Sequence, residues 1–203
     1  MTSVSESYDF IVVGASTAGC VIAARLSEDE GARVLLLEAG SEQPPPAAPI
    51  PPAWPSLQGT SADWADTTVP QAATGKPVHW PRGRGLGGSS AINAMNFVRG
   101  HRGSYDGWVT AGAQGCGFDD LLPYFRRSEH VAGRDPAIRG TAGPLTVGPA
   151  TIRHPIAEAG LAAAGDVGYR TAADLSGGLE EGFATPFVDQ QGELVATTAT
   201  TPC

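Results

Sequence analysis

The sequence predicts an α/β fold that begins with a parallel β–α–β unit and continues into an incomplete α+β region. Residues 8–13 form an apolar, β-branched run that stops at a glycine, a pattern typical of a buried strand. Residues 18–30 place an apolar face opposite a charged one, which indicates a helix ending at Gly31. Residues 33–38 form a second buried strand. This order within about 30 residues gives parallel strands and a right-handed crossover.

The next segment, residues 44–55, holds seven prolines in twelve residues. Proline lacks the backbone donor that a helix interior or a central strand requires, so we expect neither element here. Two interpretations stay open. The segment is either a linker or a loop that lies over a ligand.

Further along the chain, the sequence predicts short helices around residues 106–109 and 119–127. Residues 140–147 indicate a turn that leads into a strand, and residues 154–165 an alanine-rich helix with proline in its first turn. A last strand is expected over residues 183–188. Because residues 196–203 contain no convincing terminal element, we expect the chain to stop within a domain.

Composition narrows the classes of function. The chain has 203 residues and a formal charge of −8, which disfavours nucleic acid as a partner because its phosphates are neutralised by Lys and Arg. Four arginines nevertheless cluster within a short central stretch, which favours a small anionic ligand: Arg82, Arg84, Arg99 and Arg102.

Targeting and metal patterns are missing from the sequence. The amino terminus lacks the basic and apolar regions of a signal peptide, and no apolar run approaches the ~18 residues that span a membrane. A cytoplasmic location is therefore expected. The three cysteines lie far apart without metal-ligand spacing, and Cys20 is expected to be a small buried residue.

The turn after the first strand reads Gly14-Ala-Ser-Thr-Ala-Gly19. A dinucleotide-binding turn has the pattern G-x-G-x-x-G, in which the middle glycine lets the backbone approach the pyrophosphate closely. Here Ser16 replaces that glycine, and its hydroxyl is a candidate donor to a phosphate oxygen. Glu38 ends the second strand, where it can accept hydrogen bonds from ribose hydroxyls and disfavours the 2′-phosphate of NADP. The alternative is a plain tight turn between a strand and a helix.

A second glycine-rich segment covers residues 80–100 and includes five glycines and two adjacent serines. Its small side chains suit a backbone that lies close to a phosphorylated ligand. Two such segments about seventy residues apart suggest one large dinucleotide held from two sides.

These motifs together resemble the glucose–methanol–choline (GMC) oxidoreductases, in a choline-dehydrogenase-like form. The resemblance rests on the first β–α–β unit, on Asp63-Trp-Ala, and on Pro81-Arg-Gly-Arg-Gly-Leu-Gly-Gly-Ser-Ser-Ala-Ile-Asn-Ala-Met95. It continues through Leu122-Pro-Tyr-Phe, Gly143-Pro-Leu and Glu181-Gly-Phe, to about residue 192. The family implies a Rossmann-like FAD-binding domain with a parallel sheet over residues 1–135 and the beginning of an α+β substrate domain over 136–203.

The resemblance implies FAD as the cofactor and assigns a set of residues to it. These are Gly14, Ser16, Thr17, Ala18, Gly19, Glu38, Ala39, Trp64, Arg84, Gly87, Gly88, Ser89, Asn93, Ala94 and Met95. Some members attach the flavin covalently to a histidine in this region. The stretch Ser90-Ala-Ile-Asn-Ala-Met95 holds no histidine, so we expect non-covalent FAD.

The catalytic base is not identifiable in this chain. The family oxidises alcohols by hydride transfer to the flavin, with a histidine near the carboxyl end of a much longer chain taking the hydroxyl proton. The four histidines present are each expected to have surface, packing or helix-end roles: His79, His101, His130 and His154. The sequence thus predicts an amino-terminal part of an FAD-dependent alcohol oxidoreductase. Alternatives are an inactive nucleotide-binding fragment and an NAD-binding regulatory domain.

Overall fold

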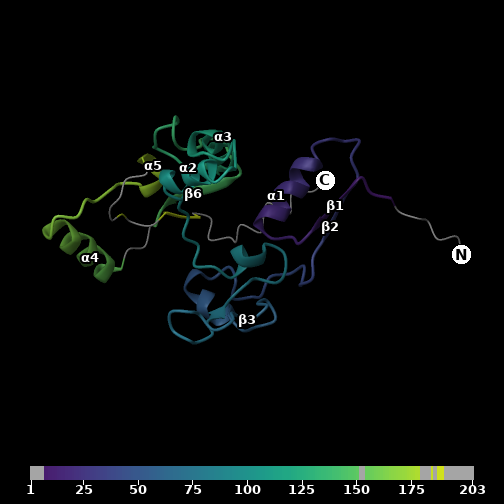
Figure 1. Ribbon diagram of the computed structural model, residues 1–203, viewed down its shortest axis with the longest axis horizontal. Coiled ribbons are helices and arrows are strands. Elements are labelled where there is room, and N and C mark those ends of the chain that lie inside the picture. The colour runs from purple at the N-terminus through teal and green to yellow at the C-terminus, as the bar shows by residue number, and fades with distance from the viewer. Residues whose placement is uncertain (1–6, 151–153, 179–183, 185–186, 190–203) are drawn as a thin grey trace, which may run out of the picture. The chain divides into compact units, whose positions relative to one another are not determined.

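The computed structural model describes residues 7–150, 154–178, 184 and 187–189. The described residues up to Met95 form one compact unit, and those from Asn96 onward form a second. Figure 1 labels most of the helices and several strands, and colours the chain by residue number. This division does not test the boundary expected at residue 135 between the FAD-binding part and the substrate domain, which stays a prediction.

The first unit opens with the predicted parallel β–α–β motif. It consists of β1 (Phe10–Val13), α1 (Thr17–Leu26) and β2 (Val34–Leu37). Residues Phe10 to Val13 pair in parallel with Val34 to Leu37, one for one. The predicted fold class is therefore confirmed. The helix ends earlier than residue 30 because the N–H groups of Glu28 and Asp29 bond to carbonyls three residues back, in tighter turns, rather than four residues back.

The helix packs closely on the strand through glycine. A Cβ added to Gly19 would lie 1.8 Å from the Gly14 carbonyl oxygen and 3.6 Å from Val12 Cγ1. No side chain fits in that space, so the third glycine of the turn fixes the distance between α1 and β1.

The proline-rich segment contains a helix that the sequence did not predict. Residues Pro51–Leu57 form a 3₁₀ helix, η1. Pro51 and Pro52 occupy its first two positions, where a missing N–H costs nothing because no partner is available there. Leu57 and Ala48 are buried with Ala62, Ala91 and Ile92 in one apolar cluster. The segment is thus part of the first unit rather than a linker.

The rest of the first unit brings the second glycine segment beside the first. The strands β3 (Asp66–Thr67) and β4 (His79–Trp80) pair antiparallel, and the 3₁₀ helix η2 covers Gly88–Ala91. Isolated bridges join Gly87 to Ser16 and Gly85 to Ser41. The backbone at 85–87 therefore runs along the ends of the β–α–β unit.

The second unit combines helices with a small mixed sheet. Its helices are α2 (Arg102–Thr110), α3 (Phe118–Ser128), α4 (Pro155–Asp166) and α5 (Leu175–Gly178). Its strands β5 (Glu129–His130), β6 (Leu145–Pro149) and β7 (Phe187–Asp189) lie in the order β5-β6-β7, parallel and then antiparallel. The helices expected near 106, 119 and 154 are confirmed. Part of the strand expected over 183–188 lies outside the described residues.

A cluster of buried charges lies within the second unit. Glu129 is fully buried, and its Oε1 accepts from Arg99 Nη2 at 2.6 Å and from the Gly140 N–H at 3.0 Å. The Nε of buried Arg139 lies 3.4 Å from the same oxygen and 3.4 Å from Asp174 Oδ2. The cluster joins the end of α3 to loops that are distant in sequence.

No helix among the described residues is long and apolar enough to cross a membrane.

Candidate functional site

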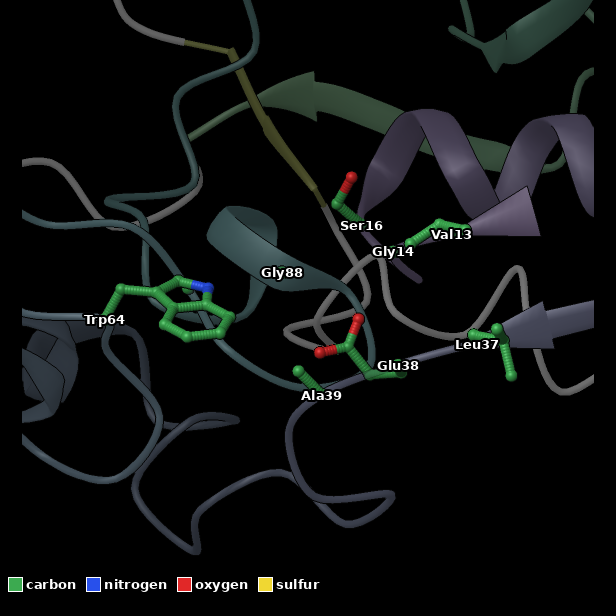
Figure 2. Close-up of a pocket in the computed structure, with 9 residues that line it drawn as sticks. Val13, Gly14, Ser16, Leu37, Glu38, Ala39, Trp64 and Gly88 are labelled. Carbon is green, nitrogen blue, oxygen red and sulfur yellow. The ribbon is translucent and has the colours of Figure 1, made fainter.

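The first unit contains a pocket of about 440 Å³ where β1 and β2 end. Figure 2 shows how its walls come from the two strand ends, the first turn and the glycine-rich segment. Ligands of open parallel α/β sheets bind outside the carboxyl ends of the strands, which is where this pocket lies. Its lining consists of Val13, Gly14, Ser16, Leu37, Glu38, Ala39, Trp64, Gly83 and Gly88.

The first turn gives the pocket the start of a helix. Gly14 has a φ of +93°, which favours glycine and lets the chain reverse sharply after β1. Ser16 is the N-cap residue of α1, with extended backbone. Its side chain makes no capping hydrogen bond, and the first turn of α1 contains no acidic residue. The helix start therefore presents free N–H groups and positive partial charge.

The second glycine segment packs directly against this turn. The Gly87 N–H donates to the Ala15 carbonyl at 2.8 Å. Gly88 has a φ of +54°, and a Cβ added there would lie 2.6 Å from the Ser16 Cβ. Two segments that are far apart in sequence thus meet at one pocket, as the sequence predicted, and glycine is required at the contact.

Glu38 links the two segments through its carboxylate. Oε2 accepts from the Ala15 N–H at 2.7 Å, while Oε1 accepts from the N–H groups of Gly40 at 2.9 Å and Gly85 at 3.0 Å. Burial raises the pKa of this carboxyl, but the backbone donors outweigh burial, so the pKa lies below its ordinary value. Oε2 has one partner among the described residues and retains capacity for a donor from a ligand.

Trp64 lines the pocket and is in contact with Arg84. The Arg84 guanidinium carbon lies 5.2 Å from the Trp64 ring centroid, a cation–π contact, and Nη2 donates to the Ala39 carbonyl at 2.9 Å. Trp64 remains 51% exposed. Arg84 thus braces Trp64 and the end of β2 together, although Arg84 itself does not line the pocket.

Asp63 organises the loop that presents Trp64. Its fully buried carboxylate accepts from the N–H groups of Ala65 at 3.0 Å, Arg82 at 2.9 Å and Gly59 at 2.8 Å. The ring of His79 lies 3.7 Å away. Sequence reasoning quoted Asp63 only within a family motif and missed this role. A buried Asp beside a residue with positive φ, Ala65, has no distinctive sequence pattern.

Several residues predicted for the cofactor lie near the pocket without lining it. Thr17, Ala18 and Gly19 form the first turn of α1, and Gly87 bridges to Ser16. The Ser89 hydroxyl accepts from the Gly83 N–H at 3.1 Å, and Asn93 Oδ1 accepts from the Met95 N–H at 2.8 Å. Ala94 lies within that last turn. Sequence reasoning also missed three lining residues, Val13, Leu37 and Gly83.

The four arginines are divided between the two units. Arg82 and Arg84 belong to the first unit, whereas Arg99 and Arg102 belong to the second. Arg99 is buried against Glu129, and Arg102 makes a two-pronged exposed pair with Asp119 at 2.7 and 2.8 Å. The four arginines therefore do not all provide positive charge for an anionic ligand, because Arg99 and Arg102 form ion pairs within the protein.

None of the four histidines lines the pocket. His101 and His154 are the N-cap residues of α2 and α4, and each ring accepts a backbone N–H. His130 was expected to close a helix, which is wrong because α3 ends at Ser128 and His130 belongs to β5. Within the described ranges, no group of three or more potential ligands could hold a metal ion.

Comparisons with known proteins agree with this fold. Residues 8–195 match the family model described as GMC oxidoreductase. The mitochondrial choline dehydrogenase of Mus musculus is 42% identical over 192 residues, covering 88% of this chain and 31% of that enzyme.

Proteins with a similar fold are also found among solved structures. Pyridoxine 4-oxidase from Mesorbium loti superposes with a TM-score of 0.87 at 40% identity, over 95% of this chain and 39% of that one. An FAD-dependent oxidoreductase from Chaetomium thermophilum gives a TM-score of 0.78 at 31% identity, over 89% and 33%. The chain spans about a third of the length of these relatives. The family match over nearly the whole sequence shows that this chain belongs to the GMC oxidoreductase family.

Proposed function

We propose that this chain holds the adenosine diphosphate half of a non-covalent FAD and is part of an oxidoreductase acting on CH–OH groups. The observation that carries the proposal is the meeting of two glycine turns and the Glu38 carboxylate at one pocket. A dinucleotide needs all three features: close backbone approach, a helix start for the pyrophosphate, and an acceptor for ribose hydroxyls.

The residues present fit this group. Gly19 and Gly88 stand where a Cβ would collide with neighbouring atoms, so the backbone packs closely at both glycines. Glu38 carries the acceptor oxygens, and Ser16 and the start of α1 supply donors. A pocket of about 440 Å³ suits part of a dinucleotide, in the ordinary range for small-molecule sites. Asn93, Ala94 and Met95 are proposed to lie on the flavin side.

The proposal of non-covalent attachment is supported by the stretch from Ser90 to Met95, which contains neither a histidine nor a cysteine for a covalent link to the flavin.

The chemistry that a bound FAD supplies is acceptance of hydride from an alcohol carbon. The hydroxyl proton must go to a base near the flavin. Because the chain spans about a third of the length of its relatives, a second candidate function is an FAD-binding polypeptide that does not turn over by itself. The names of the relatives point to hydroxyl-bearing substrates, choline and pyridoxine, and we propose a small alcohol as the substrate class here.

A flavin-binding measurement tests the proposal. We expect the purified chain to bind FAD, seen as flavin absorbance that remains after gel filtration. Glu38→Ala removes the carboxylate that binds Ala15 and Gly85, and we expect FAD affinity to fall about 10-fold or more. Exposed Glu42 provides the matched control, since Glu42→Ala should leave the affinity unchanged. A folded chain that binds no FAD would contradict the proposal.

A turnover assay separates the two candidates. Bound flavin that is reduced by alcohols, with an artificial acceptor reporting electron transfer, supports the oxidoreductase. Bound flavin with no alcohol-dependent reduction supports the second candidate.

A further inference from the structure

Ser16 departs from the dinucleotide pattern at the position that faces the phosphates, where the middle glycine is expected. We propose that the Ser16 hydroxyl donates a hydrogen bond to a pyrophosphate oxygen of the cofactor and so determines how tightly the phosphates are held. The proposal rests on the proposed function, FAD binding at this pocket. It assigns to this chain a donor that a glycine at the same position cannot provide.

The Ser16 hydroxyl is available for a ligand. A serine at a helix N-cap ordinarily accepts an N–H from the first turn of its own helix. In α1 this capping bond is not formed, and no hydrogen bond to Ser16 Oγ occurs among the described residues. The side chain is exposed and lines the pocket. Figure 2 shows its hydroxyl pointing away from the Glu38 carboxylate, so the two polar groups do not satisfy each other.

The position of Ser16 is fixed by the neighbouring segment. Its backbone pairs with Gly87, and its Cβ fits against Gly88, where a second Cβ would lie only 2.6 Å away. With φ −75° and ψ −179°, the residue is in ordinary extended backbone and carries no strain. The serine is thus accommodated by a glycine across the contact. The hydroxyl is held at the helix start, where anions bind.

The dipole of α1 favours a phosphate at its start rather than a neutral group, while the Glu38 carboxylate holds the neighbouring Ala15 N–H. The first turn of α1 has no acidic residue, so its positive end is not neutralised from within the helix. Hydrogen bonds to charged partners are about twice as strong as those to neutral ones. A hydroxyl donor at this position should therefore strengthen the binding of the phosphates more than that of the adenosine.

The test compares ligands with and without phosphates. ADP, adenosine and FAD are titrated into the wild type, Ser16→Ala and Ser16→Gly, with binding followed by calorimetry. For both variants we expect ADP and FAD to bind about 10- to 100-fold more weakly, while adenosine affinity changes less than about twofold. Ser27→Ala, at the opposite end of α1, is the matched control and should leave all three affinities unchanged.

Other outcomes would overturn the inference. If Ser16→Gly binds ADP as tightly as the wild type or more tightly, close backbone approach governs affinity rather than the hydroxyl. Equal losses for ADP and adenosine would place Ser16 away from the phosphates. These results leave FAD binding by the wild type intact, whereas a wild type that binds neither FAD nor ADP contradicts the proposed function itself. Circular dichroism of each variant verifies that the fold is retained.

Discussion

At the scale of single residues, two carboxylates build the first unit by binding backbone N–H groups. Glu38 accepts three such groups and Asp63 accepts three. The position of Glu38 at a strand end was visible in the sequence and indicated a ribose acceptor. Its bond to the Gly85 N–H was not, because that partner lies 47 residues away and no local pattern specifies it.

Acid should destabilise the first unit through Asp63. Burial raises the pKa of this carboxyl, but N–H donors and the charge of His79 outweigh burial and hold the pKa below its ordinary value of 3.8. A carboxyl whose pKa is lowered on folding stabilises the fold above its ordinary pKa. That stabilisation is lost as the pH falls through the folded pKa. We therefore expect the Trp64 environment to open below about pH 3.8, measured as tryptophan emission against pH.

The variant Asp63→Asn isolates this carboxyl. The amide oxygen can still accept from Ala65 and Arg82, but the bond from the Gly59 N–H is lost and the group no longer titrates. The variant should be less stable at neutral pH and show a smaller change with acid. An acid transition identical to that of the wild type would show that Asp63 is not the titrating group.

At the scale of elements, the β–α–β unit was predictable because its pattern is local. Apolar runs, a helical face and two glycines specify β1, α1 and β2 without distant partners. The 3₁₀ helix at Pro51–Leu57 was missed because proline content excludes an α-helix but permits a short 3₁₀ turn that begins with proline. The buried charge cluster around Glu129 was also missed, because it joins residues from four separate segments.

The Glu129 cluster should be essential to the second unit. Glu129→Gln leaves Arg99 and Arg139 buried without their shared carboxylate. Loss of one partner from a buried ion pair typically costs about 3–5 kcal/mol. We expect a large decrease in the urea midpoint, followed through Trp108 emission. Asp119→Asn breaks an exposed pair with Arg102 and serves as the control, with little expected effect. Equal shifts in the two variants would contradict the prediction.

At the scale of the whole molecule, the β–α–β unit leaves apolar side chains in solvent. Ile11 is 60% exposed, Val13 82% and Ile22 51%. Exposed apolar side chains, where they gather into a patch, mark an interface or a tendency to aggregate. The relatives, about three times longer, carry further polypeptide, and the family fold was recognisable from this third because its cofactor motifs lie here.

Expressed as these 203 residues, the chain should bind a hydrophobic dye and self-associate. Changing Ile11 and Ile22 together to threonine should reduce both dye fluorescence and the light-scattering mass. Val69→Thr removes a more exposed side chain, at 77%, but from a loop outside the β–α–β unit, and should change neither. A chain that stays monomeric and dye-free at micromolar concentration would contradict this expectation.

The hydrogen bonds of Glu38 have a consequence for the speed of cofactor capture. One carboxylate fastens both the first turn at Ala15 and the second segment at Gly85, so the two walls of the pocket are joined through bonds that need no ligand. Little loop entropy is then left to lose on association. Cofactor uptake should proceed in a single kinetic phase, and variants of the pocket should differ chiefly in residence time.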